Sequence, residues 1–236
     1  MKTFMNTNTG ALKSMKSAVG QVLGFLFPSE ESVRKFETAP AAELVKILPA
    51  SEPIQTVNKV QIQANALFAY SDERVKNLVW EIKYYRNEKI ADVVGELIAE
   101  RIKKVLIQIY GERGFSVEQF FLVPIPLTNR RLRERGFNHT VMLAQSILKY
   151  LPENFELAGS FFEKIRHTPK QSSIEDRIQR FENIVGAFRV PNPESVIGKN
   201  IIIIDDVITT GATVAEAKNV LENAGVRNVQ IFAIAH

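Results

Sequence analysis

The chain has 236 residues, of which 45% are hydrophobic and 24% charged, with a formal net charge of +4. This length and apolar content suffice for one substantial core with a small accessory segment. The mild positive charge agrees with phosphorylated ligands but does not require nucleic acid, because a lysine-rich surface explains it equally. The absence of cysteine excludes disulfides, thiol catalysis and Cys-ligated zinc, and three scattered histidines indicate no metal cluster, so we expect no metal site built from protein side chains.

Residues 1–62 are predicted to form an N-terminal helical segment and a hood, with little regular pattern. The apolar stretch 18–27 is shorter than the roughly 20 residues that a membrane span needs, and no small-residue cleavage site follows closely, so we predict a cytoplasmic protein without a membrane span. Apolar residues from Leu12 to Leu26 share one helical face, which predicts an amphipathic helix packed on the domain; binding to a membrane surface is the alternative. Another helix is expected over 41–48.

Residues 63–236 are predicted to form the main domain, in which strands and helices alternate. This alternation indicates an α/β fold with an open parallel sheet flanked by helices. The predicted strands cover 63–70, 120–126, 155–165, 187–190, the isoleucines from 201 and 229–235. The predicted helices cover 75–82, 90–111, 138–151 and 214–224. Residues 129–136 are expected to be a basic loop and 171–184 a polar segment.

The most informative stretch of the chain is IIIIDDVITTGAT, residues 201–213. Four consecutive isoleucines are typical of a strand buried on both faces, so Asp205 and Asp206 are expected where that strand ends. The small residues that follow would let backbone N–H groups approach an anion, with Gly211 free to adopt a positive φ. Carboxylates at this position can accept hydrogen bonds from sugar hydroxyls. The predicted ligand is a ribose 5-phosphate.

A helix is predicted directly after this loop, with its positive end facing the phosphate. Thr213 and Glu216 match a capping box, and Gly225 is placed to end the helix. The alternative is an ordinary turn between strand and helix with surface aspartates. The stretch is no Walker A loop because no lysine follows the glycine, and no G-x-G-x-x-G occurs in the chain.

Four arginines follow the predicted strand 120–126 closely: Arg130, Arg131, Arg133 and Arg135. Ligands of open α/β sheets bind at the carboxyl edge of the strands, where these side chains are expected beside Asp205. Clustered arginines can neutralise a pyrophosphate through paired charge-assisted hydrogen bonds. The alternatives are a solvated basic loop and a patch for the nucleic-acid backbone.

Residues 166–171, RHTPKQ, begin a segment too polar for the core that continues through Arg177, Arg180 and Asn183. Such a segment could close as a flap over a phosphorylated ligand, or could be an exposed linker. We leave His167 out of the catalytic set, because a lone exposed histidine is more often neither acid nor base.

Together these stretches resemble the ComF family of phosphoribosyltransferase-like proteins. VPIPLTNRRLRERGFNHT is similar to the family's first motif, RHTPKQSSIEDRIQRFENIVGAF to its middle motif, and IIIIDDVITTGAT to its phosphoribosyl-pyrophosphate (PRPP) loop. The segment from Phe68 to Ala99 also resembles the family's lead-in. One departure is plain, because the cysteine-rich N-terminal segment common in the family is replaced here by VLGFLFPSEESVRKFETAP.

The resemblance implies a type I phosphoribosyltransferase fold, with a five-stranded parallel core, helices on both faces and a variable hood. It implies that Asp205 and Asp206 contact the ribose hydroxyls and are the catalytic groups. The rest of the implied PRPP site, whose last five residues hold the 5-phosphate, is Val207, Thr209, Thr210, Gly211, Ala212 and Thr213. The residues implied to face pyrophosphate are Pro126, Leu127, Arg133, Arg135 and Arg166. The implied cofactor is Mg²⁺, held mainly by PRPP and water.

The activity implied by the resemblance is transfer of a 5-phosphoribosyl group from PRPP to a nitrogen nucleophile, with release of pyrophosphate, as in nucleotide metabolism. The acceptor, a nucleobase or another amine, is not identified by any pocket in the sequence. The alternative is a protein without transferase activity that binds PRPP or a nucleotide, or that handles single-stranded DNA during DNA uptake in competence. A homodimer stays open, because related folds often pair.

Overall fold

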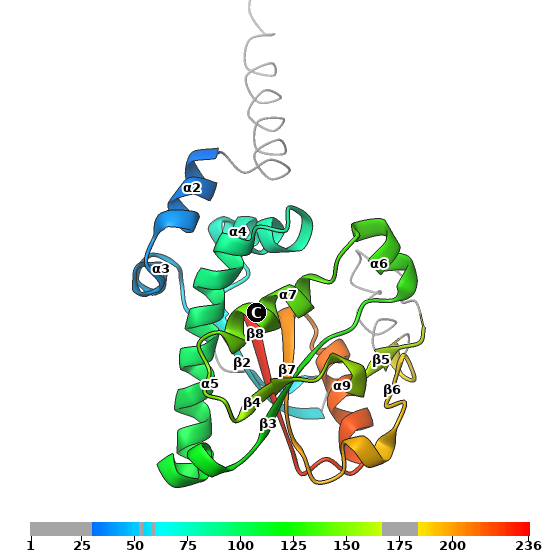
Figure 1. The fold of residues 1–236 in the computed structure, drawn as a ribbon. Coiled ribbons are helices and arrows are strands. Elements are labelled where there is room, and N and C mark those ends of the chain that lie inside the picture. The colour runs from blue at the N-terminus through cyan, green and yellow to red at the C-terminus, as the bar shows by residue number, and fades with distance from the viewer. Residues whose placement is uncertain (1–29, 52–53, 58–59, 167–183) are drawn as a thin grey trace, which may run out of the picture.

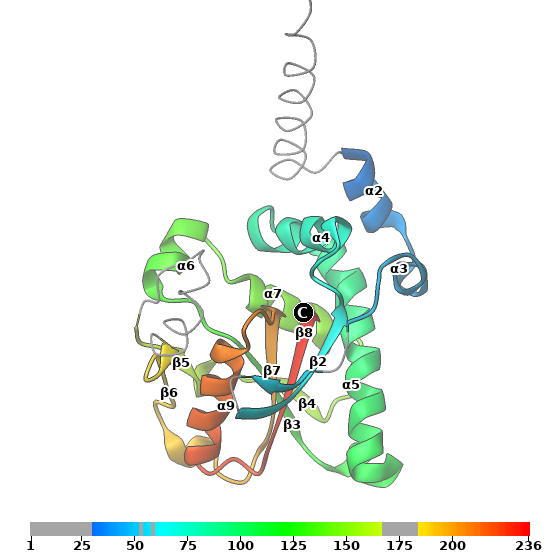
Figure 2. The same ribbon diagram turned by 180° about the vertical axis from the view of Figure 1, so that it is seen from behind.

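The fold is built on one mixed sheet, whose spatial order is β1-β2-β8-β7-β3-β4 (Figures 1 and 2). The computed structural model describes residues 30–51, 54–57, 60–166 and 184–236. Five neighbouring strands pair in parallel, while β1 pairs antiparallel with β2 at one edge. The strands are β1 (Ile54–Val57), β2 (Val60–Phe68), β8 (Asn228–Ala235), β7 (Asn200–Val207), β3 (Phe120–Pro124) and β4 (Phe155–Leu157). The expected parallel α/β fold is confirmed.

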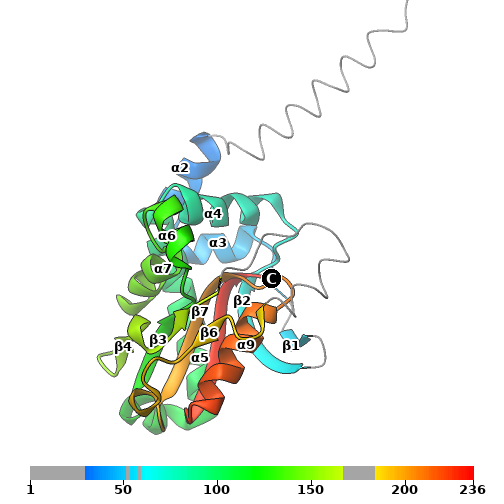
Figure 3. The same cartoon turned by 90° about the vertical axis from the view of Figure 1, so that its right-hand side faces the viewer.

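Helices cover both faces of the sheet (Figures 1 and 3). One face carries α4 (Glu73–Tyr84), α5 (Glu88–Val117) and α7 (His139–Leu148), whose apolar side chains share a core with Phe120 and Leu122 of β3. The other face carries α9 (Ala212–Asn223), which shares a second core with Phe121 and Val123. Because both faces are covered, polar groups that serve a ligand must emerge at an edge of the sheet.

Strand β7 shows why the isoleucine run identified this architecture. Ile202 and Ile204 lie in the core beneath α5 and α7, whereas Ile201 and Ile203 lie in the core beneath α9. All four side chains are at most 1% exposed. Successive side chains of a strand point to opposite faces, so the two aspartates that follow must also diverge, one toward each layer of helices.

The helices α5 and α7 pack so closely that Gly95 has no room for a side chain. A Cβ built on Gly95 would lie 2.8 Å from the backbone carbonyl carbon of Ser146 and 2.9 Å from the amide nitrogen of Ile147. Backbone atoms cannot yield as a flexible side chain can. The contact therefore fixes the distance between α5 and α7.

We expect Gly95→Ala to lower the free energy of unfolding by about 1–3 kcal/mol, because the added methyl group must push two helix backbones apart. Urea unfolding would measure the loss. Glu96→Ala, at the exposed neighbouring position of the same helix, is the matched control and should change stability by less than about 0.5 kcal/mol. A stability of the Gly95 variant equal to that of the control would contradict this close packing.

The segment predicted as a basic loop over 129–136 is instead a short helix, α6 (Asn129–Arg135). Its N-terminus is capped by Thr128, whose side chain accepts from the Arg131 amide at 3.4 Å, and Gly136 ends it with a φ of 76°. Arg130 and Glu134 form an i,i+4 ion pair at 2.8 Å. Each of these is a known helix signal, and the density of arginines obscured them.

The single strand predicted over 155–165 is also wrong. Only β4 joins the main sheet there, and a 3-10 turn, η1 (Gly159–Phe161), leads into β5 (Glu163–Lys164), which pairs antiparallel with β6 (Phe188–Arg189) as a separate ribbon. The chain then passes η2 (Pro193–Ser195) into β7. The stacked rings of Phe162 and Phe188, 4.7 Å apart, anchor the ribbon against the α9 side of the sheet.

Among the residues that the structure describes, two further helices precede the sheet: α2 (Glu30–Thr38) and α3 (Ala41–Ile47), the latter close to its expected range. The predicted domain boundary near residue 62 falls inside β2 and stays a prediction. The expected amphipathic helix from Leu12 to Leu26, His167 and the polar segment as far as 183 lie outside the described residues. Within the described part of the chain, no helix combines the length and apolarity needed to cross a membrane.

Candidate functional site at the carboxyl edge of the sheet

The loop between β7 and α9 lies at the carboxyl edge, as expected for a phosphate site. Gly211 is the N-cap of α9 with a φ of 70°, which glycine adopts without strain. It provides no side-chain cap, and the first turn of α9 contains no acidic residue. The first backbone N–H groups of this helix are thus presented without a side-chain anion competing for them, which favours a phosphate.

The predicted capping box at this helix is wrong. The N-cap is Gly211, two residues before Thr213, and the Glu216 carboxylate instead accepts a hydrogen bond from the Gly186 amide at 2.7 Å. Glu216 therefore ties the end of the segment before β6 to α9. Of the three threonines of the predicted phosphate loop, Thr209 is exposed while Thr210 and Thr213 are half-buried. The Thr210 hydroxyl accepts from the Ala212 amide at 3.5 Å.

Asp205 and Asp206 are polar residues near the end of β7, and they are 7% and 6% exposed. Asp205 continues the face of Ile203 toward α9, and its Oδ1 accepts from the Asp206 amide at 2.9 Å. Burial, together with the charge of Asp206, raises the pKa of Asp205 above its usual range. Asp205 is therefore disposed to be the neutral member of the pair, and Asp206 the charged one.

Asp206 points to the other face and contacts two side chains that the sequence did not single out. Its Oδ2 forms an ion pair with Lys83 Nζ from α4 and lies 2.9 Å from His139 Nε2 at the start of α7. Its Oδ1 accepts from the Val207 amide at 2.8 Å. Burial opposes ionisation, but the Lys83 ammonium and the His139 ring outweigh it and hold the pKa of Asp206 well below its usual range.

His139 links this carboxylate to the arginine helix. Its Nδ1 lies 3.0 Å from Arg135 Nη1, and the Arg135 guanidinium lies 4.8 Å from the centroid of the Tyr84 ring. A guanidinium can only donate, so Nδ1 must accept and Nε2 must carry the proton donated to Asp206. Burial also lowers the pKa of His139 despite the neighbouring Asp206. His139 is therefore a neutral imidazole in a fixed tautomer.

The residues predicted to face pyrophosphate lie in three places: after β3, on α6 and after β5. Pro126 and Leu127 follow β3 and are half-buried, Arg133 is exposed on α6, and Arg135 is bound to His139 and Tyr84. Arg166 is exposed beyond β5 and donates to the Val185 carbonyl at 2.5 Å. Arg135 thus joins the ribose side of the site more closely than expected, and its assignment to pyrophosphate stays a prediction.

A second positive group approaches Asp205 on the opposite face. Burial and the neighbouring Arg131 charge lower the pKa of Lys164 to about 8, although Asp205 is close enough to oppose the shift. Lys164 lies on β5 and Arg131 on α6. Lys164 on the β5–β6 ribbon therefore lies within electrostatic range of both Arg131 on α6 and Asp205 on β7.

A comparison with known proteins assigns this edge of the sheet to a family. The model of the phosphoribosyl transferase domain matches residues 138–236. DNA utilization protein YhgH of Escherichia coli O157:H7 is 30% identical over 159 residues, a match that covers 66% of this chain and 65% of that protein. Competence protein ComFC of Streptococcus pneumoniae is 28% identical over 176 residues, covering 74% and 69%. Together these matches support a ComF-type phosphoribosyltransferase-like protein.

Two further similarities complete the comparison. Competence protein F of Haemophilus influenzae is 27% identical over 115 residues, covering 48% of this chain and 49% of that protein. A crystal structure of a hypoxanthine-guanine phosphoribosyltransferase from Bacillus anthracis aligns with a TM-score of 0.37 and 15% identity, covering 62% of this chain and 69% of that one. The family assignment rests on the sequence matches. The domain match includes His139 and both aspartates, whereas Lys83 and Arg135 precede it.

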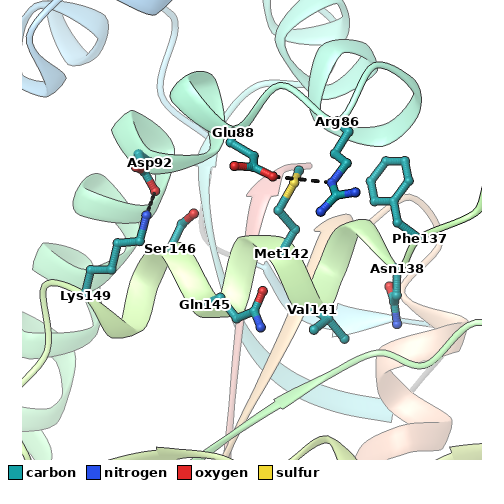
Figure 4. A pocket seen from close by; sticks show the side chains of 10 residues that line it. All are labelled: Arg86, Glu88, Asp92, Phe137, Asn138, Val141, Met142, Gln145, Ser146 and Lys149. Atoms are coloured by element: carbon teal, nitrogen blue, oxygen red, sulfur yellow. Dashed lines mark hydrogen bonds and ion pairs between the residues drawn. The ribbon is translucent and has the colours of Figure 1, made fainter.

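A pocket of about 530 Å³ lies beside this edge, on the outer face of α7 (Figure 4). Its charged lining residues are paired with one another: Arg86 with Glu88 at 3.3 Å, and Lys149 with Asp92 at 2.6 Å. None of the predicted PRPP residues lines it. The pocket is therefore separate from the carboxylates, and its paired charges give it no preference for a charged ligand.

Proposed function

We propose that this ComF-type protein binds PRPP at the carboxyl edge of β7 and transfers its 5-phosphoribosyl group to a nitrogen acceptor. The observation that carries the proposal is the arrangement of two buried carboxylates, the Gly211 turn and the uncapped first turn of α9 along one continuous segment. In this arrangement the helix N-terminus holds the 5-phosphate, and the carboxylates lie next to the ribose.

The cations of the site would stabilise the pyrophosphate leaving group. Exposed Arg133 on α6 is available for an anion at the carboxyl edge, and Lys164 lies within electrostatic range of Asp205. Charge that develops on the ribose as pyrophosphate departs would be stabilised by the Asp206 carboxylate, which is kept ionised by Lys83. The acceptor class in this proposal is a nucleobase or another amine, and the setting is nucleotide metabolism in the cytoplasm.

Mg²⁺ fits this site as an ion carried by the ligand. The described residues contain no group of three or more acidic, histidine or cysteine side chains able to enclose a metal. Phosphate oxygens of PRPP and water molecules suit a hard octahedral ion, which keeps several waters and needs no dedicated protein cage. When bound, Mg²⁺ would neutralise charge on the pyrophosphate. PRPP binding is therefore expected to depend on Mg²⁺.

Calorimetric titration with PRPP, with and without Mg²⁺, tests the proposal. We expect binding by the wild-type protein in Mg²⁺ and loss of affinity by about tenfold or more in Thr209→Glu, because the new carboxylate repels the 5-phosphate. Asn219→Glu, exposed near the other end of α9, is the matched control and should bind as wild type does. A folded wild-type protein without affinity for PRPP would refute the proposed function.

A second candidate function is the handling of single-stranded DNA in competence. Two observations favour it: α6 carries four arginines, of which Arg130 and Arg133 are exposed, and relatives are named as competence or DNA utilization proteins. A basic helix beside a phosphate site suits a nucleic-acid backbone as well as pyrophosphate. Charge reversal on α6 can distinguish the two functions, because its effects on PRPP binding and on DNA binding can be measured separately.

A further inference from the structure

Asp206 is held by several donors in the absence of any ligand. Lys83 and His139 both contact Oδ2, while the Val207 amide donates to Oδ1. A carboxylate has about four accepting positions, so these three contacts leave about one. Asp206 can therefore accept from a single sugar hydroxyl, and the direction of that bond is fixed by the contacts already made.

Lys83 supplies the positive charge in this arrangement. His139 is neutral, so it contributes a hydrogen bond without a charge, and Arg135 acts on Asp206 only through that ring. The other carboxylate nearby is Asp205, which favours its neutral form. The Lys83 side chain is 25% exposed and that of Asp206 8%, so the ion pair lies at the boundary between the core and the ligand site.

We propose that Lys83 is a positioning residue of the PRPP site, which keeps the Asp206 carboxylate ionised and leaves one of its oxygen positions for a ribose hydroxyl. This inference rests on the proposed function. It extends the site to α4, which lies before the residues matched by the phosphoribosyl transferase domain. His139 and Arg135 hold the same carboxylate from the side of α7 and α6, so the ribose contact and the arginine helix are joined through one chain of hydrogen bonds.

Titration of the Asp206 carboxyl carbon by NMR gives a direct reading of this role. In Lys83→Met, burial no longer has an opposing ammonium, so the pKa of Asp206 should rise, whereas in Lys76→Met it should stay as in wild type. Lys76 lies on the same helix and pairs with Glu73 at 2.6 Å, which makes it the matched control. A pKa of Asp206 unchanged by Lys83→Met would overturn the inference.

PRPP affinity measured against pH provides the second reading. We expect Lys83→Met to bind PRPP about tenfold or more weakly, since a hydrogen bond to a charged group contributes about 1.5–3 kcal/mol. The ratio of its affinity to that of wild type should fall further as the pH is lowered, because Asp206 of the variant becomes protonated at a higher pH than in wild type. Using the ratio removes the titration of the phosphates themselves. Lys83→Arg should restore most of the affinity and a constant ratio.

Two outcomes separate this inference from the proposed function. If wild-type protein binds PRPP and Lys83→Met matches it at every pH, the inference alone fails. If folded wild-type protein binds no PRPP, both fail. Lys83→Met leaves the Asp206 charge buried without a counter-ion, so the double variant Lys83→Met, Asp206→Asn is included. Its affinity for PRPP relative to wild type should be low and the same at every pH, because the titrating carboxyl is absent. A ratio in the double variant that still changes with pH would assign the effect to another group and overturn the inference.

Discussion

Asp206→Ala is expected to lower the free energy of unfolding by about 3 kcal/mol, because it leaves a charged partner without its counter-ion in a largely buried place. Lys83 would lose its ion pair and the His139 Nε2 proton its acceptor. Urea unfolding at neutral pH measures the loss. The cost arises from the groups left behind, so it should appear in the absence of any ligand.

Asp205→Ala is the comparison that makes this prediction specific. Asp205 is as buried as Asp206, yet its pKa is raised, and its Oδ1 accepts a hydrogen bond from the backbone amide of the next residue. Removing a carboxyl that burial already disfavours should cost about 1 kcal/mol, the loss of one ordinary hydrogen bond. Equal losses in the two variants would contradict the different charge states assigned to the two carboxyls.

Combining Asp206→Ala with Lys83→Met should recover much of the lost stability, because a buried ion pair can be replaced by apolar groups with little net cost. PRPP affinity should stay low in the double variant. The double variant would then be stable but unable to bind PRPP well, a combination that a general folding defect could not produce. A double variant as unstable as Asp206→Ala would show that the Lys83 charge is not the source of the loss.

The sequence was most informative where a residue pattern has a single structural solution. Four isoleucines in succession require burial on both faces, so they predicted the central strand and placed the aspartates at its end, as β7 shows. The order of strand, glycine turn and helix then predicted the phosphate loop at the carboxyl edge. The roles of the predicted site residues stay predictions, because the structure shows their positions without a ligand.

The partners of Asp206 could not be predicted in this way. Lys83 and His139 come from helices on one face of the sheet, and their contact with β7 depends on how α4 and α7 pack, which no local pattern states. The scatter of the three histidines in sequence indicates no metal cluster, and nothing in the sequence singles out His139 among them. One signal was available in the sequence. Adjacent aspartates on a strand point to opposite faces, so one of them had to point toward the layer of helices that contains α4 and α7.

The arginine helix offers the sharpest distinction between the two candidate functions. We expect Arg130→Glu, Arg131→Glu, Arg133→Glu to weaken PRPP binding strongly in either case, since these residues lie on α6, which follows β3 at the carboxyl edge of the sheet. Arg135 is left unchanged, because it holds His139. If the protein handles single-stranded DNA, the same variant should also lower the slope of log affinity against log salt by about 2, at about 0.7 for each lost phosphate contact.

Fluorescence anisotropy with a labelled single strand at several salt concentrations measures that slope. The control reverses three exposed cations on α5, Arg101, Lys104 and Arg113, which changes the net charge equally without touching the carboxyl edge. A slope lowered only by the α6 reversals would place DNA on the same surface as pyrophosphate, so that the two ligands compete. Equal effects of both variants would indicate attraction by net charge alone and refute an α6 site for DNA. A loss of PRPP affinity with an unchanged DNA slope would assign α6 to pyrophosphate.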